Sequence, residues 1–142
     1  MIAYIIQPDD KSVIHFSVPD LNEMGLDKIY QLLSTDIKKV NCIDAVRDYS
    51  NPENTDLIYI DDEGLLIDEN YAFSFNDNAY FGRGIVLGND AEGKSTSPMM
   101  PIEYYMKSIR LPKGVIKTED FIQPPVILPF DSLEDVVDLI NE

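Results

Sequence analysis

Apolar residues recur along the chain with two periods, and each period predicts a different kind of element. Alternating or continuously apolar runs predict β-strands, and three stripes with apolar residues at i, i+3, i+4 and i+7 predict amphipathic helices. Strands and helices do not alternate regularly, so the pattern predicts an α+β fold: an antiparallel sheet of β-hairpins with two or three amphipathic helices packed on it. The predicted strands cover residues 2–7, 12–18, 40–46, 56–61, 65–67 and 84–87, and the predicted helices cover 26–33, 102–109 and 133–140.

Turn-forming residues separate these runs. Pro8-Asp9-Asp10 predicts an N-terminal hairpin, and Gly64 predicts a second hairpin between residues 56–61 and 65–67. The polar stretch 48–55 predicts an exposed loop. Residues 70–81 alternate aromatic and polar side chains around a loop-like centre. Further turns are expected at residues 88–90 and 92–94.

The size of the chain predicts one domain. A chain of 142 residues, 44% hydrophobic, is long enough to bury a core without disulfides or metals. We therefore expect a single domain over 1–142. Residues 113–142 form a C-terminal extension in which 123–129 predicts an edge strand and Asp131 with Glu134 caps an acidic helix.

The charge is strongly negative: 26 acidic residues against 11 Lys and Arg give −15. Such a field repels nucleic-acid phosphates and anionic membranes, so direct nucleic-acid binding is not expected. It fits solubility alone, or a basic protein partner. One function hypothesis is therefore an acidic interaction inhibitor, a nucleic-acid mimic that occupies a basic surface of a host protein.

Nothing in the sequence predicts catalysis, a metal or a cofactor. The chain has a single histidine, His15, a single cysteine, Cys42, and no nucleophile-elbow motif. The carboxylates at 61–63 and 89–92 do not follow the spacing of a calcium loop and instead match turn chemistry. Without a catalytic motif, we expect that the protein is not an enzyme. With no signal peptide and no run of 18 apolar residues, we expect it to be cytoplasmic.

One segment has the parts that a nucleotide site needs. Tyr80 and Phe81 precede Gly82-Arg83-Gly84, which offers aromatic faces, backbone N–H donors and a guanidinium. The alternative is that Phe81 belongs to the core, the glycines form a bulge and Arg83 is solvated.

Two further cations are spaced one helical turn apart. Lys107 and Arg110 share a helix face and could together meet an anion in this negatively charged protein. The alternative is that both cations only stabilise the negative end of the helix dipole, near the C-terminus of the predicted helix.

The residues IYIDDEGLL followed by YFGRGIVLGNDAEGKSTSP resemble a family of short phage and prophage proteins over residues 56–111. That family includes or neighbours the Thoeris anti-defence sponge proteins, which bind cyclic ADP-ribose-type signals or small cyclic oligonucleotides without cleaving them. The resemblance implies a homo-oligomer built from dimers. It also implies that Phe81 stacks on adenine, Asn89 hydrogen-bonds the ligand and Arg110 meets phosphate.

Overall fold

A central antiparallel sheet organises the computed structural model, which describes residues 1–18, 27–64, 67, 69–112, 114 and 116–117. Its strands are β1 (Ile2–Gln7), β2 (Ser12–Ser17), β3 (Ile43–Arg47), β4 (Leu57–Asp61), β8 (Gly84–Asn89) and β9 (Ser95–Thr96). Two small sheets pair β5 (Glu69–Asn70) with β10 (Ile116–Lys117), and β6 (Ala72–Phe75) with β7 (Asn78–Phe81). The helices are the 3-10 turn η1 (Pro8–Asp10), α2 (Asp27–Leu33) and α3 (Ile102–Ser108).

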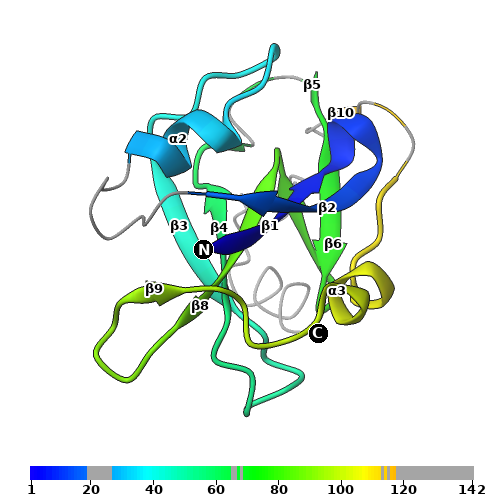
Figure 1. Cartoon of the computed structure of the whole chain (residues 1–142). Helices are drawn as coiled ribbons and strands as arrows, with labels where there is room; N and C mark the ends of the chain where they lie inside the picture. Colours follow the sequence, from blue (N-terminus) through cyan, green and yellow to red (C-terminus); the bar gives the residue numbers. More distant parts are fainter. Residues whose placement is uncertain (19–26, 65–66, 68, 113, 115, 118–142) are drawn as a thin grey trace, which may run out of the picture.

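The six strands of the central sheet lie in the order β2-β1-β8-β4-β3, with β9 paired to β8 (Figure 1). All of these pairings are antiparallel. With two helices accompanying this sheet, the α+β class predicted from the sequence is confirmed.

The N-terminal hairpin is also confirmed. β1 and β2 pair from Ile2 opposite Ser17 to Gln7 opposite Ser12. Between them η1 places a proline at its start, where the missing N–H costs nothing. Lys11 then takes a left-handed conformation with φ of 50°, and its N–H donates to the carbonyl of Pro8.

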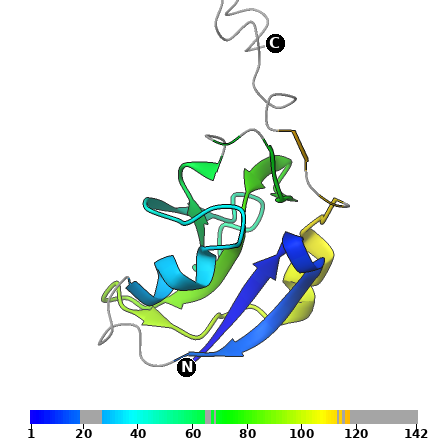
Figure 2. The ribbon, with the colours of Figure 1, turned by 90° about the horizontal axis from the view of Figure 1, so that it is seen from above.

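Both faces of the central sheet are covered, which explains why β1 and β8 read as continuous apolar runs. On one face, Tyr4, Ile6, Ile58 and Val86 pack with residues of β6 and α3. On the other face, Ala3, Ile85 and Leu87 pack with Ile29 and Leu33 of α2. Figure 2 shows the two helices on opposite sides of β1.

The helical stripes predicted at 26–33 and 102–109 correspond to α2 and α3, each seven residues long. Ile102, Tyr105 and Ile109 are buried as the spacing predicted, whereas Met106 is 56% exposed. Pro101 caps α3 from just outside its first turn.

The predicted hairpin of residues 56–61 with 65–67 is wrong. β4 forms as expected, but it pairs with β3 on one edge and β8 on the other. Leu65 and Leu66 lie outside the described residues, and the two edges of β4 are already occupied. The turn signal was local, whereas β4 pairs with β3, the strand before it, and with β8, which follows the β6–β7 hairpin.

Two other boundaries differ from the predictions. The strand expected at 40–46 begins three residues later, as β3, and Val40 is instead buried beneath α2. Gly88 and Asn89, expected in a turn, extend β8 and pair with β9. A Cβ at Gly88 would lie 2.3 Å from the carbonyl oxygen of Ser97, so the close approach of β9 requires glycine there.

Several predictions fall on residues that the structure does not describe. These are the edge strand at 123–129 and the acidic helix at 133–140 with its cap at Asp131 and Glu134. Of the predicted extension 113–142, the described residues are Gly114 and β10.

Candidate ligand-binding groove

A groove of about 460 Å³ separates the β6–β7 turn from the C-terminal end of α3. Its volume lies within the range of small-molecule sites, which is roughly 300–1,000 Å³. Polar side chains dominate the lining: Ser74, Phe75, Asn76, Asp77, Asn78, Ala79, Lys107, Ser108 and Arg110.

The β6–β7 turn that forms one wall is a tight hairpin. Phe75 pairs with Asn78, and the two residues between them, Asn76 and Asp77, have φ of 54° and 65°. Two successive positive φ angles are typical of the hairpin turns whose twist matches that of the strands, and Asn and Asp tolerate this conformation. The alternation of aromatic and polar residues at 70–81 predicted only a loop-like centre here, so the hairpin is a difference from the prediction.

Backbone and side-chain contacts hold the two walls together. Ser74 and Arg110 form an isolated antiparallel bridge, with N–H to carbonyl distances of 3.0 and 3.1 Å. The Asn76 amide donates to Asp48 Oδ1 at 3.2 Å, and the Ser108 hydroxyl donates to the Tyr104 carbonyl at 2.7 Å. The groove is therefore built from ordered segments.

Lys107 and Arg110 both line this groove, as their spacing predicted. Their side chains are exposed. In the part of the chain that the structure describes, neither forms an ion pair; the two ion pairs there are Lys38–Asp61 and Arg83–Asp9. The groove thus presents two cations to solvent, with the carboxylate of Asp77 on the same lining.

Beneath the groove lies a buried polar network that includes Asp48 and Asn54, so the prediction of an exposed loop at 48–55 is wrong for these two residues. Asp48, Asn54 and Asp56 are 5%, 2% and 2% exposed. The Tyr105 hydroxyl donates to Asp56 Oδ2 at 2.8 Å and accepts from Asn54 Nδ2 at 3.0 Å. Asp56 also accepts the backbone N–H groups of Met99 at 2.7 Å and Met100 at 3.1 Å.

Asp48 links this network to the groove. It accepts hydrogen bonds from the hydroxyl groups of Ser50 and Tyr104 and from the amides of Asn54 and Asn76. Burial favours its neutral form, but these hydrogen bonds stabilise the carboxylate and lower the pKa of Asp48 below its ordinary value. Burial and the bond to Asp48 raise the pKa of Tyr104, and burial raises that of Tyr105.

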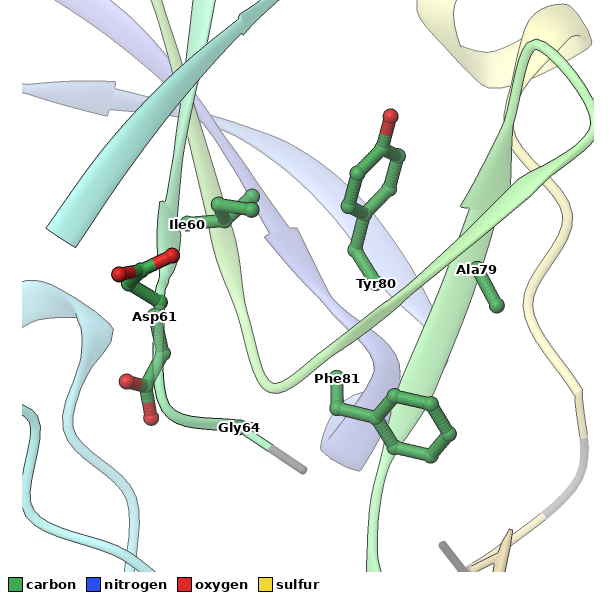
Figure 3. A pocket seen from close by; sticks show the side chains of 7 residues that line it. Ile60, Asp61, Gly64, Ala79, Tyr80 and Phe81 are labelled. Carbon is green, nitrogen blue, oxygen red and sulfur yellow. The ribbon is translucent and has the colours of Figure 1, made fainter. Parts of the chain in front are cut away.

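A second, smaller cavity lies beside Phe81 (Figure 3). Its volume is about 130 Å³, too small for a nucleotide and close to the size that holds a benzene ring. Phe81 itself is 5% exposed, and Gly64 packs against its backbone. Tyr80 is half-buried, with its ring centroid 5.5 Å from that of Phe73. The lining residues are Ile60, Asp61, Asp62, Gly64, Ala79, Tyr80 and Phe81.

Arg83 is half-buried and lines neither the groove nor the small cavity. Its Nη2 lies 2.7 Å from Asp9 Oδ2 and its Nε lies 3.0 Å from Asp9 Oδ1, a bidentate ion pair to η1. The hydrogen bond from Arg83 lowers the pKa of Asp9. Arg83 therefore links the residue before β8 to the N-terminal hairpin. The sequence predicted instead that its guanidinium would contact phosphate or solvent.

The six predicted ligand residues thus lie in four places. Lys107 and Arg110 share the groove, Tyr80 and Phe81 line the small cavity, and Arg83 is paired with Asp9. Asn89, half-buried at the end of β8, pairs with Ser95. The residues at 76–78 were missed as groove-lining groups, although an Asn-Asp pair between alternating aromatics was the signal for a turn.

Comparison with known proteins returns no relative: no family model, curated protein or solved structure matches the chain. Among the described residues, no group of three His, Cys, Asp or Glu side chains is placed to hold a metal ion. No helix in the described ranges is both long and apolar enough to cross a bilayer. The geometry of the groove is therefore the basis for a functional proposal.

Proposed function

We propose that this protein binds and sequesters a small phosphate-bearing cyclic nucleotide without cleaving it, as the phage anti-defence sponge proteins that it resembles do. The observation that carries the proposal is the groove of about 460 Å³ where Lys107 and Arg110 meet. The phage setting, the cytoplasmic location and an oligomer built from dimers come from the resemblance or the sequence and belong to the same proposal.

The charge of the protein makes these two cations informative. A net charge of −15 repels an anionic ligand at long range, so a phosphate needs local positive charge to bind. Arg110 offers a planar fork of donors suited to phosphate, and Lys107 adds a mobile ammonium from the adjacent helical turn. Since Arg110 is held by its backbone bridge to Ser74, its exposed side chain is left for a ligand.

The residues of the groove support binding rather than turnover. Its described lining contains no histidine or cysteine, and the Ser108 hydroxyl is engaged by the Tyr104 carbonyl. A serine nucleophile is usually activated by an adjacent general base, and among the described residues the Ser108 hydroxyl bonds a backbone carbonyl instead. We therefore expect the ligand to be recovered intact after the protein is unfolded.

Calorimetric titration with cyclic ADP-ribose isomers and cyclic dinucleotides tests the proposal. Arg110→Gln should weaken binding by about tenfold or more, the value of a lost charge-assisted contact. Arg47→Gln is the matched control, because Arg47 is an exposed arginine on β3 that does not line the groove. Equal affinities for the two variants, or no binding to any cyclic nucleotide, would refute the proposal.

The acidic interaction inhibitor is the second candidate, and the observation that favours it is the total charge of −15. A complex with a basic host protein should form rapidly and weaken steeply as ionic strength rises. Affinity capture followed by a salt titration distinguishes it, because Arg110→Gln should leave such a complex unchanged.

A further inference from the structure

Asp77 stands out among the groove residues because a carboxylate weakens any purely anionic site. It is exposed at the tip of the β6–β7 turn and lines the same groove as Lys107 and Arg110. The turn does not require this charge, since asparagine adopts a φ of 65° as readily as aspartate. A site for inorganic phosphate alone would be better served by Asn at this position.

The chemistry of the three charged groups is complementary. Lys107 and Arg110 have only donors to offer, and the carboxylate of Asp77 has only acceptors. Within the described residues, Asp77 forms no ion pair with either cation. The ligand that satisfies all three has an anionic group at one end and hydroxyl donors at the other.

The groove gives a nucleobase less to recognise than a sugar phosphate. Phe75 is the one aromatic residue in its described lining, and that side chain is 2% exposed, so its ring offers no open face for stacking. The Asn76 amide is already bonded to Asp48. Selectivity should therefore come from the sugar and the phosphate.

We propose that Asp77 accepts a hydrogen bond from a ribose hydroxyl of the ligand whose phosphate contacts Lys107 and Arg110. The groove then selects ribonucleotides over deoxyribonucleotides, largely without regard to the base. This inference rests on the proposed function, because it names the ligand class of the same groove.

The test compares cyclic ADP-ribose with its 2′-deoxy and 3′-deoxy analogues by calorimetric titration of the full-length protein. Loss of a hydrogen bond to a charged acceptor should weaken one deoxy analogue by about tenfold or more. Asp77→Asn keeps the turn but replaces the charged acceptor with a neutral amide oxygen, so it should reduce the preference for the ribose form by several-fold. Glu92→Gln is the control, because it removes the same charge from an exposed residue outside the groove.

The outcomes separate the inference from the function it extends. A ribose preference that Asp77→Asn reduces several-fold and Glu92→Gln preserves supports the role of Asp77. Equal binding of all three ligands overturns that role and leaves the sequestration proposal intact. Tighter binding of every ligand by Asp77→Asn overturns it too, because the carboxylate then only repels phosphate. No binding of any cyclic nucleotide overturns both.

Discussion

Removing one hydroxyl from the buried network beneath the groove should cost a large share of the stability of the fold. Tyr105 is 1% exposed, and its hydroxyl bridges Asp56 Oδ2 at 2.8 Å and Asn54 Nδ2 at 3.0 Å. Tyr105→Phe keeps the ring, which lies with its centroid 5.1 Å from that of Tyr104 and 5.7 Å from that of Tyr4. The substitution therefore isolates the two hydrogen bonds from the packing.

The size of the stability loss depends on which hydrogen bonds Asp56 and Asn54 retain in the variant. Asp56 Oδ2 retains the N–H of Met100 at 3.1 Å, and Asn54 Nδ2 retains Asp48 at 3.2 Å, so neither group is left wholly unpaired. A hydrogen bond to a carboxylate contributes about 1.5–3 kcal/mol and a neutral one about 0.5–1.5 kcal/mol. We expect Tyr105→Phe to lower the free energy of unfolding by about 2–4 kcal/mol.

Urea unfolding followed by circular dichroism measures this loss. For a domain that unfolds with a slope near 2 kcal/mol per molar, the midpoint should fall by about 1–2 M. Tyr49→Phe is the matched control: Tyr49 is 75% exposed and its hydroxyl should contribute less than about 0.5 kcal/mol. If the midpoints of the two variants coincide, the network does not stabilise the fold and the reasoning fails.

Two other substitutions test the electrostatics and the packing. The pKa of Asp48 is lowered in the folded protein, so its contribution is present above the ordinary aspartate pKa of about 3.9 and is lost as pH falls through the folded value. Asp48→Asn should therefore show a shallower loss of stability as pH falls below about 4 in urea titrations, and a pH dependence equal to that of the unsubstituted protein contradicts this. Gly64→Ala should lower the free energy of unfolding by about 1–3 kcal/mol, because the added Cβ would lie 2.3 Å from the Phe81 carbonyl oxygen. An unaltered melting temperature of that variant would show that the strand can move aside.

The elements that the sequence predicted well are those decided by local patterns. The N-terminal hairpin, α2, α3 and the apolar strand β8 follow from period and turn chemistry within a few residues. The predicted partner of β4 was wrong because a local turn signal does not show which edges a strand shares: β4 pairs with β3, the strand before it, and with β8, beyond the β6–β7 hairpin.

The candidate site was only partly predictable, for a related reason. Helical spacing brought Lys107 and Arg110 together, but nothing local indicated that the β6–β7 turn would face them. Asp48 looked like a surface loop residue, although four side chains separated from it by 2 to 56 positions satisfy its carboxylate. Arg83 looked free for the same reason, since its partner Asp9 is 74 positions away.

Chemical-shift mapping of backbone amides during titration with a cyclic ADP-ribose isomer tests the central claim most directly, because it reports where the ligand binds. We expect the shifts to concentrate at residues 74–79 and 107–110, with little change at Phe81 and Gly82. Shifts centred on the cavity beside Phe81, or no shifts at saturating ligand, would contradict the groove as the binding site.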